Sequence, residues 1–321
     1  MTDNFDLLKS RLSEGVLAFP ATPFSPSDDI DRDALSRHVG DLVGGAPCAL
    51  VPAGGAGELF SLSAVEHEAV IRTTVEASGG IPVVAGIGNG FAITIDMAIA
   101  AERAGADALL LLPPYLTTAE QEGLYAFVRG VCQAVSIGVI AYSRNNGVLS
   151  TSTVMRLAET CNNFIGVKDG VGDFEVLNQL ALSAGDRFVV INGVPTAEIL
   201  AAQCFAIGIR SYSSAVFAFA PSVARRFFEA IRDGERAVSD HLMRELYLPL
   251  IALRNRRRGY AVSLVKGGLK AVGRGIGSVR APLVDLAEAE VEEIALLTEK
   301  AQAYIASLPV VAHPGIAGAA R

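Results

Sequence analysis

Short runs of apolar and β-branched residues alternate with longer stretches of helical periodicity along most of the chain. Eight of these runs have the composition of buried strands: residues 15–24, 48–54, 82–88, 108–114, 137–143, 164–170, 188–193 and 208–215. The stretches between them show apolar residues at helical spacing, as in residues 31–43, 63–77, 91–104, 118–134 and 151–160. The pattern therefore predicts a strand followed by a helix, repeated eight times.

This repeat predicts a closed (β/α)8 TIM barrel. Strands so uniformly apolar suit a parallel sheet that is covered on both faces, and each crossover between parallel strands requires a helix-sized connection. An open, doubly wound sheet is the second possibility. Its commonest use, dinucleotide binding, lacks support, because no Gly-x-Gly-x-x-Gly opens a helix after the first strand and the glycines of 86–90 are better interpreted as a turn.

Further helices are expected after the eighth unit, at 221–234, 236–258, 261–271 and 285–306. We therefore divide the chain into a barrel with a short N-terminal helix (1–232), a C-terminal helical extension (233–306) and a flexible tail (307–321). The extension contains a basic run at 254–258, which predicts a solvated face or a contact between subunits.

Composition and charge exclude several classes of protein. Hydrophobic residues make up 51% of the 321 residues and charged residues 19%, which predicts a large core and excludes intrinsic disorder. The net charge of −7 argues against a nucleic-acid partner. The most apolar stretches, 108–114 and 199–209, are too short to span a membrane, and the acidic first residues do not resemble a secretory signal, so we expect a cytoplasmic protein without a membrane partner.

The four cysteines and four histidines are scattered along the chain. The cysteines lie in or beside apolar segments, which predicts buried, reduced thiols. We expect neither a metal site nor a histidine-centred triad.

In a barrel of this kind the functional site lies where the strands end, at their carboxyl ends. The candidate residues at those positions are Thr22, Gly55 and Ala56 in the turn 54–58, Tyr115, Tyr142, Arg144, Lys168, Asn192, Gly193, and Ser213 and Ser214 within 211–214. The glycine-rich turn brings free backbone N–H groups to the start of a helix, where they suit an anion.

Lys168 is the strongest candidate, because it ends an apolar strand in a chain with few lysines. Burial in a barrel mouth lowers the pKa of a lysine toward the neutral amine, which can attack a carbonyl group. The alternative is a structural ion pair between Lys168 and Asp169.

Tyr142 ends the preceding strand and is suited to proton transfer, or alternatively closes the top of the core. Arg144, two residues later, can offer a bidentate fork to a carboxylate, or can belong to a surface loop.

Several of these motifs occur together in a known superfamily. Ala-Thr-Pro-Phe at 21–24, the Gly-x-x-Gly-Glu turn at 54–58, Pro-Pro-Tyr at 113–115 followed by Gln-Glu-Gly-Leu at 121–124, Tyr-x-Arg at 142–144 and Gly-Val-Lys-Asp-Gly at 166–170 resemble the dihydrodipicolinate synthase/N-acetylneuraminate lyase superfamily in order and spacing. The resemblance covers about residues 10–300. It implies a barrel enzyme that forms a Schiff base with 2-oxo acids, assembles as a homotetramer and needs no cofactor, with Lys168 as the Schiff-base lysine and Tyr142 as its proton-transfer partner.

Departures from the superfamily pattern indicate a branch within it. Gly55 and Ala56 stand where the synthase and the sialate lyase carry two hydroxyl residues that hold the pyruvyl carboxylate, and Leu116 replaces a second tyrosine. The chain instead resembles the branch that dehydrates and decarboxylates 5-dehydro-4-deoxyglucarate to 2,5-dioxopentanoate, although a threonine is expected there at position 56. The backbone N–H groups of Gly55 and Ala56 are then expected to hold the near carboxylate.

A sugar diacid also has a far carboxylate, for which Arg144, Asn192 and the hydroxyls of 211–214 are the candidates. Two other functions remain open from the sequence. One is an aldolase that cleaves a 2-oxo-3-deoxy sugar acid and releases pyruvate. The other is a non-catalytic barrel that binds a sugar acid.

Overall fold

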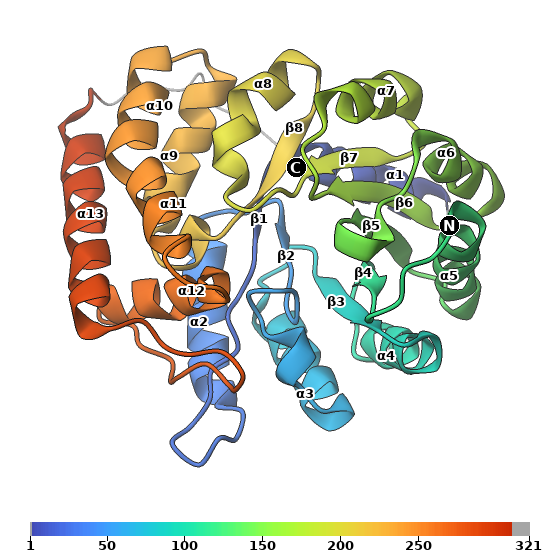
Figure 1. Ribbon diagram of the computed structural model, residues 1–321, viewed down its shortest axis with the longest axis horizontal. Helices are drawn as coiled ribbons and strands as arrows, with labels where there is room; N and C mark the ends of the chain where they lie inside the picture. The colour runs from blue at the N-terminus through green and yellow to red at the C-terminus, as the bar shows by residue number, and fades with distance from the viewer. Residues whose placement is uncertain (1, 310–321) are drawn as a thin grey trace, which may run out of the picture.

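The computed structural model describes residues 2–309, and its centre is a barrel of eight parallel strands (Figure 1). The strands are β1 (Glu14–Ala18), β2 (Ala49–Leu50), β3 (Val84–Asn89), β4 (Ala108–Pro114), β5 (Gly138–Ser143), β6 (Phe164–Asp169), β7 (Val189–Asn192) and β8 (Arg210–Ser214). They pair in the order β2-β1-β8-β7-β6-β5-β4-β3, and a parallel bridge between Leu50 and Val83 joins the two ends. The predicted (β/α)8 barrel is confirmed.

Helices follow the strands and surround them (Figure 1). They are α2 (Arg32–Gly44), α3 (Ala64–Ala77), α4 (Phe91–Arg103), α5 (Gln121–Ala134), α6 (Thr151–Thr160), α7 (Phe174–Ala184), α8 (Ala201–Ala206) and α9 (Pro221–Arg232). Local sequence fixes several starts: the Asp31 carboxylate caps α2, Ser63 and Glu66 form a capping box on α3, and Pro221 opens α9. Short helical turns η1 (Leu59–Ser61), η2 (Asn145–Gly147), η3 (Ala197–Leu200) and η4 (Val216–Ala218) lie between strands and helices.

Buried apolar side chains form two layers, one inside the barrel and one between the strands and the helices. Leu17, Ile140 and Ile165 belong to the inner layer. The N-terminal helix α1 (Thr2–Ser13) adds Leu8 and Leu12 to it, so this helix fills the end of the barrel opposite the carboxyl ends of the strands. In Figure 1, α1 lies behind the strands.

An irregularity in β6 decides which way Lys168 points. Val139 of β5 pairs with Phe164, but the next residue, Ile140, pairs with Gly166, so Ile165 is an extra residue in β6. Ile165 and Lys168 both face the interior, although simple alternation from Ile165 would turn Lys168 outward. A β-carbon at Gly166 would lie 2.8 Å from a methyl group of Val189, so glycine is needed at this bulge.

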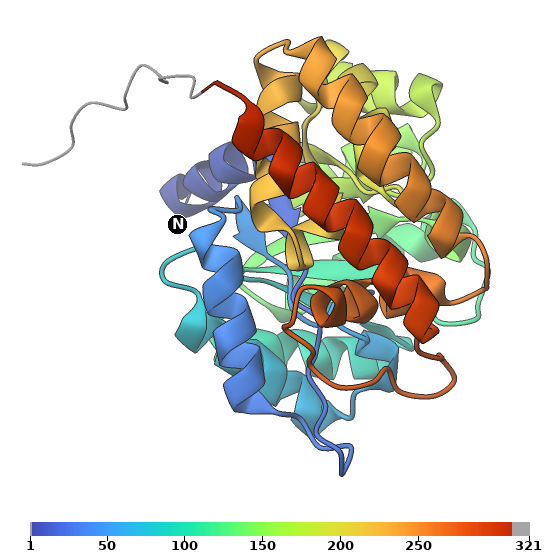
Figure 2. The same ribbon diagram turned by 90° about the vertical axis from the view of Figure 1, so that its left-hand side faces the viewer.

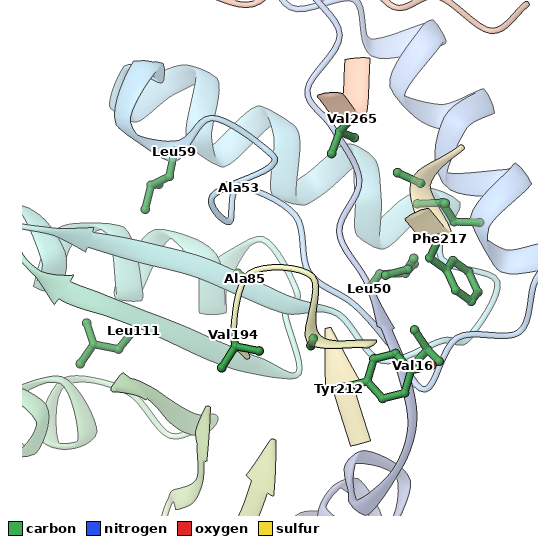
Figure 3. Packing of buried hydrophobic residues seen from close by; sticks show 14 of the residues in the cluster. Val16, Leu50, Ala53, Leu59, Ala85, Leu111, Val194, Tyr212, Phe217 and Val265 are labelled. Carbon is green, nitrogen blue, oxygen red and sulfur yellow. The ribbon is translucent and has the colours of Figure 1, made fainter. Parts of the chain in front are cut away.

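The C-terminal segment adds α10 (Arg236–Leu242), the π-helical η5 (Met243–Tyr247), α11 (Leu248–Arg254), α12 (Tyr260–Ala271) and α13 (Glu288–Ser307). Helix α13 runs across the outside of the other C-terminal helices (Figure 2). Val265 of α12 and Leu250 of α11 belong to the same buried cluster as barrel residues such as Val16 and Tyr212, several of which are labelled in Figure 3. The division into a barrel and a C-terminal extension stays a prediction, and of the predicted tail at 307–321, residues 310–321 lie outside the described residues.

Within residues 2–309, no helix combines the length and apolar character required to cross a membrane. All four cysteines are free, with Cys132, Cys161 and Cys204 buried and Cys48 half-buried.

Candidate active site

Lys168 lies near the end of β6 with only 4% of its surface exposed. Its Nζ is 3.6 Å from the centre of the Tyr142 ring and 5.4 Å from that of Phe19. The Gly193 carbonyl oxygen is 3.5 Å from Nζ, at the outer limit of a hydrogen bond. Burial lowers the pKa of Lys168 below its ordinary value, because an ammonium is poorly solvated here, and the Arg144 charge adds to this effect against an opposing effect of Tyr142.

Asp169 does not form the ion pair that the sequence left open for Lys168. Its Oδ2 accepts hydrogen bonds from the backbone N–H groups of Val171, at 3.2 Å, and Gly172, at 2.7 Å. The Asp169 carboxylate therefore stabilises the turn after β6 and leaves the Lys168 amine without a direct carboxylate partner among the described residues.

Tyr142 stands beside Lys168 because the two residues are register partners on β5 and β6. Its hydroxyl donates a hydrogen bond to the Gly193 carbonyl oxygen at 2.9 Å and accepts one from Nη1 of Arg144 at 3.0 Å. Burial alone would raise the pKa of this phenol, but the charges of Lys168 and Arg144 outweigh burial and lower the pKa. The phenol is thus adapted to give and take a proton next to the amine.

These side chains open into a cavity of about 350 Å³ at the carboxyl ends of the strands. Eight of the predicted site residues line it: Gly55, Ala56, Tyr142, Arg144, Lys168, Gly193, Ser213 and Ser214. Phe19, Leu110 and Leu112 supply apolar walls, and residues of α11 and α12 close the cavity from outside the barrel. An amine and a phenol therefore face a small, largely apolar chamber.

The turn at 54–58 presents backbone to this cavity. Gly55 is exposed and Ala56 half-buried, and neither amide donates a hydrogen bond to another described residue. Behind the turn, the Thr22 hydroxyl donates to the Gly57 carbonyl oxygen at 2.6 Å. Both N–H groups are thus without a protein acceptor among the described residues, and their predicted role in holding an anion stays a prediction.

A buried ion pair also holds this turn. The Nζ of Lys266, on α12, lies 2.8 Å from Oε1 of Glu58, and the two side chains are 2% and 0% exposed. Lys266 also donates to the Ser278 carbonyl oxygen at 2.7 Å, and the backbone N–H of Arg280 donates to Oε2 of Glu58 at 2.9 Å. The C-terminal segment is thus anchored to the turn that borders the cavity.

Three predicted substrate-binding residues do not line the cavity. Thr22 is fully buried behind the turn at 54–58. Tyr115 is 63% exposed, because β4 ends before it and the chain turns outward. Asn192 is buried and structural: its amide group donates to the Ala197 carbonyl oxygen at 2.9 Å and accepts from the Val194 backbone N–H at 3.4 Å.

The two adjacent serines at the end of β8 differ in their surroundings. The Ser214 hydroxyl donates to Oε1 of Glu198 at 2.5 Å and accepts from the Phe217 backbone N–H at 3.1 Å. Ser213 is half-buried and lines the cavity, and its hydroxyl has no hydrogen-bond partner among the described residues. Of the two, Ser213 is better placed to contact a ligand.

Arg254 lines the cavity although the sequence assigned its basic run, 254–258, to a solvated or subunit-contact face. It is the last residue of α11, and its Nη1 donates to the Thr196 hydroxyl at 2.7 Å. The following residues, 255–259, are exposed, in agreement with that interpretation. Only the returning path of the C-terminal helices brings Arg254 to the barrel mouth, and no local motif signals it.

The chain is similar to known proteins over most of its length. Residues 12–301 match the model of the Dihydrodipicolinate synthetase family. A protein of Rhizobium rhizogenes named "Probable 5-dehydro-4-deoxyglucarate dehydratase" is 45% identical over 92% of this chain and 98% of its own length. One of the same name from Saccharopolyspora erythraea is 47% identical over 90% of this chain and 94% of its own. The crystal structure of dihydrodipicolinate synthase from Bacillus clausii is similar with a TM-score of 0.83 and 26% identity, covering 92% of this chain and 99% of that one.

Proposed function

The chain belongs to the Dihydrodipicolinate synthetase family, and we propose that it dehydrates and decarboxylates 5-dehydro-4-deoxyglucarate to 2,5-dioxopentanoate, carbon dioxide and water. The names of its relatives supply the substrate. The observation that carries the chemistry is the buried Lys168 amine against the Tyr142 ring, in a cavity large enough for a six-carbon acid.

The reaction begins at Lys168. Its neutral Nζ attacks the ketone carbon of the substrate to form a carbinolamine. The Tyr142 phenol gives its proton to the carbinolamine hydroxyl, which leaves as water, so a protonated imine and the Tyr142 phenolate remain. The carboxylate next to the ketone lies on the N–H groups of Gly55 and Ala56. Burial supports this step, because it favours the neutral amine over the ammonium.

Dehydration follows from the electron demand of the imine. The cation acidifies the adjacent CH2 group, and Tyr142, or a water molecule that it orients, removes a proton to give an enamine. The enamine expels the β-hydroxyl group, which leaves as water with the proton that the phenol returns. The hydrogen bonds of Tyr142 to Gly193 and Arg144 hold the hydroxyl at the position this shuttle requires.

Decarboxylation uses the same electron sink. After dehydration the imine is conjugated with a C=C bond, so the electrons of the bond to the far carboxylate flow along the conjugated system to nitrogen and carbon dioxide leaves. Protonation of the resulting dienamine leaves an enol at the carbon that lost carbon dioxide, and this enol tautomerises to an aldehyde. Hydrolysis of the imine by water then releases 2,5-dioxopentanoate and regenerates the amine of Lys168.

The direct test is product analysis with 5-dehydro-4-deoxyglucarate. The proposal expects one carbon dioxide and one 2,5-dioxopentanoate per substrate, and a borohydride-reduced adduct on Lys168. Lys168→Arg, which keeps the charge but cannot form the imine, should lose activity by a factor on the order of 10⁴ or more. Pyruvate as the product would indicate the aldolase instead, and a protein that binds the acid without an adduct would be the non-catalytic barrel.

We also propose that the enzyme acts in the cytoplasm as a homotetramer, with a small sugar diacid as its ligand and neither nucleic acid nor membrane as partner. Four free cysteines suit a reducing compartment. The net charge of −7 does not suit a polyanion. Analytical ultracentrifugation that finds one or two chains per particle would contradict the tetramer.

A further inference from the structure

Two guanidinium groups, those of Arg144 and Arg254, line the active-site cavity. Among the described residues, neither has a carboxylate oxygen within 4 Å. Arg144 donates to the Tyr142 hydroxyl at 3.0 Å, whereas Arg254 donates to the Thr196 hydroxyl at 2.7 Å and, through Nε, to the Asn255 side chain at 3.2 Å. The hydrogen-bond partners of both guanidinium groups among the described residues are therefore neutral.

The environment of Arg254 is unfavourable for a lone cation. Burial and, after it, the charge of Arg144 lower the pKa of Arg254 from its usual value. Glu198 acts in the opposite direction, but its Oε1 accepts from Ser214, and burial raises the pKa of this carboxyl group to about 7. Glu198 thus carries only part of a negative charge near neutral pH, and an anion in the cavity would relieve the excess of positive charge.

We propose that Arg254 is the specificity-determining residue for the far carboxylate of a 2-oxo diacid, with its guanidinium held in position by Thr196. This inference rests on the proposed function, and it replaces Asn192, which is buried and committed to Ala197, as a ligand of that carboxylate. The Arg144 guanidinium stays hydrogen-bonded to the Tyr142 hydroxyl.

The ring order of the strands supports a substrate that extends across the barrel mouth. The turn with Gly55 and Ala56 follows β2, whereas Lys168 lies on β6, four places away around the ring of eight, and Thr196 follows β7. A substrate with one carboxylate on the turn after β2 and its ketone at Lys168 extends its remaining carbon atoms away from that turn. Arg254, on α11, closes the cavity from outside the ring.

The chemistry indicates which kinetic parameter Arg254 should control. During decarboxylation negative charge moves away from the far carboxylate, so a cation bound there stabilises the reactant more than the transition state. We therefore expect Arg254 to contribute to binding and selectivity, and its loss to raise KM for a diacid much more than it lowers kcat.

Two unsubstituted 2-oxo acids test the inference apart from turnover. 2-Oxoadipate and 2-oxohexanoate have the same chain length and differ in the far carboxylate, and neither has a hydroxyl group to eliminate. The readout is the concentration of each acid that gives half-maximal borohydride-trapped adduct on Lys168. The proteins are wild type, Arg254→Gln, Arg254→Lys, and Arg258→Gln, which removes an exposed charge from the same basic run.

Wild type and Arg258→Gln should trap 2-oxoadipate at a lower concentration than 2-oxohexanoate. Arg254→Gln should lose about 10- to 100-fold of this preference, as expected for charge-assisted hydrogen bonds, with 2-oxohexanoate little changed, and Arg254→Lys should recover part of it. An unchanged preference in Arg254→Gln, or no adduct with either acid on any of the proteins, would overturn the inference. If wild type shows an Arg254-dependent preference for the diacid but releases no carbon dioxide from 5-dehydro-4-deoxyglucarate, the proposed function fails and the inference stands.

Discussion

Gly193 leaves no space for a side chain beside Lys168. A β-carbon at position 193 would lie 2.5 Å from Cγ of Lys168 and 2.8 Å from both Cε and Nζ. The Gly193 carbonyl oxygen meanwhile accepts the Tyr142 hydroxyl hydrogen bond. One glycine directly after β7 therefore both makes room for the amine and positions the phenol.

Gly193→Ala should move the Lys168 amine away from the Tyr142 hydroxyl. We expect adduct formation with pyruvate to slow by at least about 10-fold and the free energy of unfolding to fall by about 1–3 kcal/mol, as for overpacking of a filled interior. Borohydride trapping followed by intact-mass measurement gives the first quantity, and urea unfolding the second. Wild-type trapping in this variant would show that the contact at 193 is not needed for the position of the amine.

Tyr142→Phe removes the hydroxyl group and keeps the ring that contacts Nζ of Lys168. Because general acid–base catalysis contributes about 10²–10⁴-fold, kcat for 5-dehydro-4-deoxyglucarate should fall by that factor while KM changes little. The imine should still be trapped with pyruvate, more slowly than in wild type. A variant with normal kcat would exclude Tyr142 as the proton-transfer group.

Adduct formation should depend on pH through Lys168. The neutral amine is the nucleophile, so the rate of trapping with pyruvate should rise with pH and level off above the pKa of Lys168, which burial holds below 10.5. Since the Arg144 charge also lowers this pKa, Arg144→Gln should shift the rising limb to higher pH. Arg258→Gln, at an exposed position, serves as the control that should leave the limb in place. A limb unmoved by Arg144→Gln would mean that Arg144 does not act on the amine.

The barrel could be predicted from sequence because its strands are apolar on both faces and its helices are periodic. All five helical stretches predicted between the strands form helices. Strand ends were less predictable: the run 48–54 contains only a two-residue strand, Ala49–Leu50, because the loops at the barrel mouth are also buried and apolar.

The site could be predicted only in part, because side-chain direction depends on pairing between strands. Lys168 faces inward owing to the extra residue Ile165, and a bulge is a property of two strands and not of one. The sequence alone also does not show that Gly193 lines the cavity whereas the adjacent Asn192 is buried. The sequence places Arg254 on a solvated or subunit-contact face, because only the packing of the C-terminal helices brings this residue back to the cavity.

Lys266 should contribute to stability through its buried partner Glu58. Lys266→Met leaves that carboxylate buried without its cation, which should cost about 3–5 kcal/mol in the free energy of unfolding. The double variant Glu58→Gln/Lys266→Met should recover a part of this loss. Lys270→Met on the same helix breaks an exposed pair with Glu288 and should cost no more than about 1 kcal/mol. Urea unfolding at one fixed protein concentration measures all four proteins, and equal losses in the two lysine variants would contradict a special role for the buried pair.

Glu198 should make the protein less stable as the pH rises. Burial raises the pKa of this carboxyl group from 4.5 to about 7, so between these values the folded protein binds more protons than the unfolded chain and the free energy of unfolding falls with increasing pH. Glu198→Gln keeps an acceptor for the Ser214 hydroxyl but does not ionise. From about pH 5 to about pH 8, wild type should therefore lose about 2–3 kcal/mol relative to this variant. If the free energy of unfolding changes with pH equally in the two proteins, Glu198 has the same pKa in the folded protein as in the unfolded chain. The same result would remove the argument that Glu198 only partly neutralises Arg254.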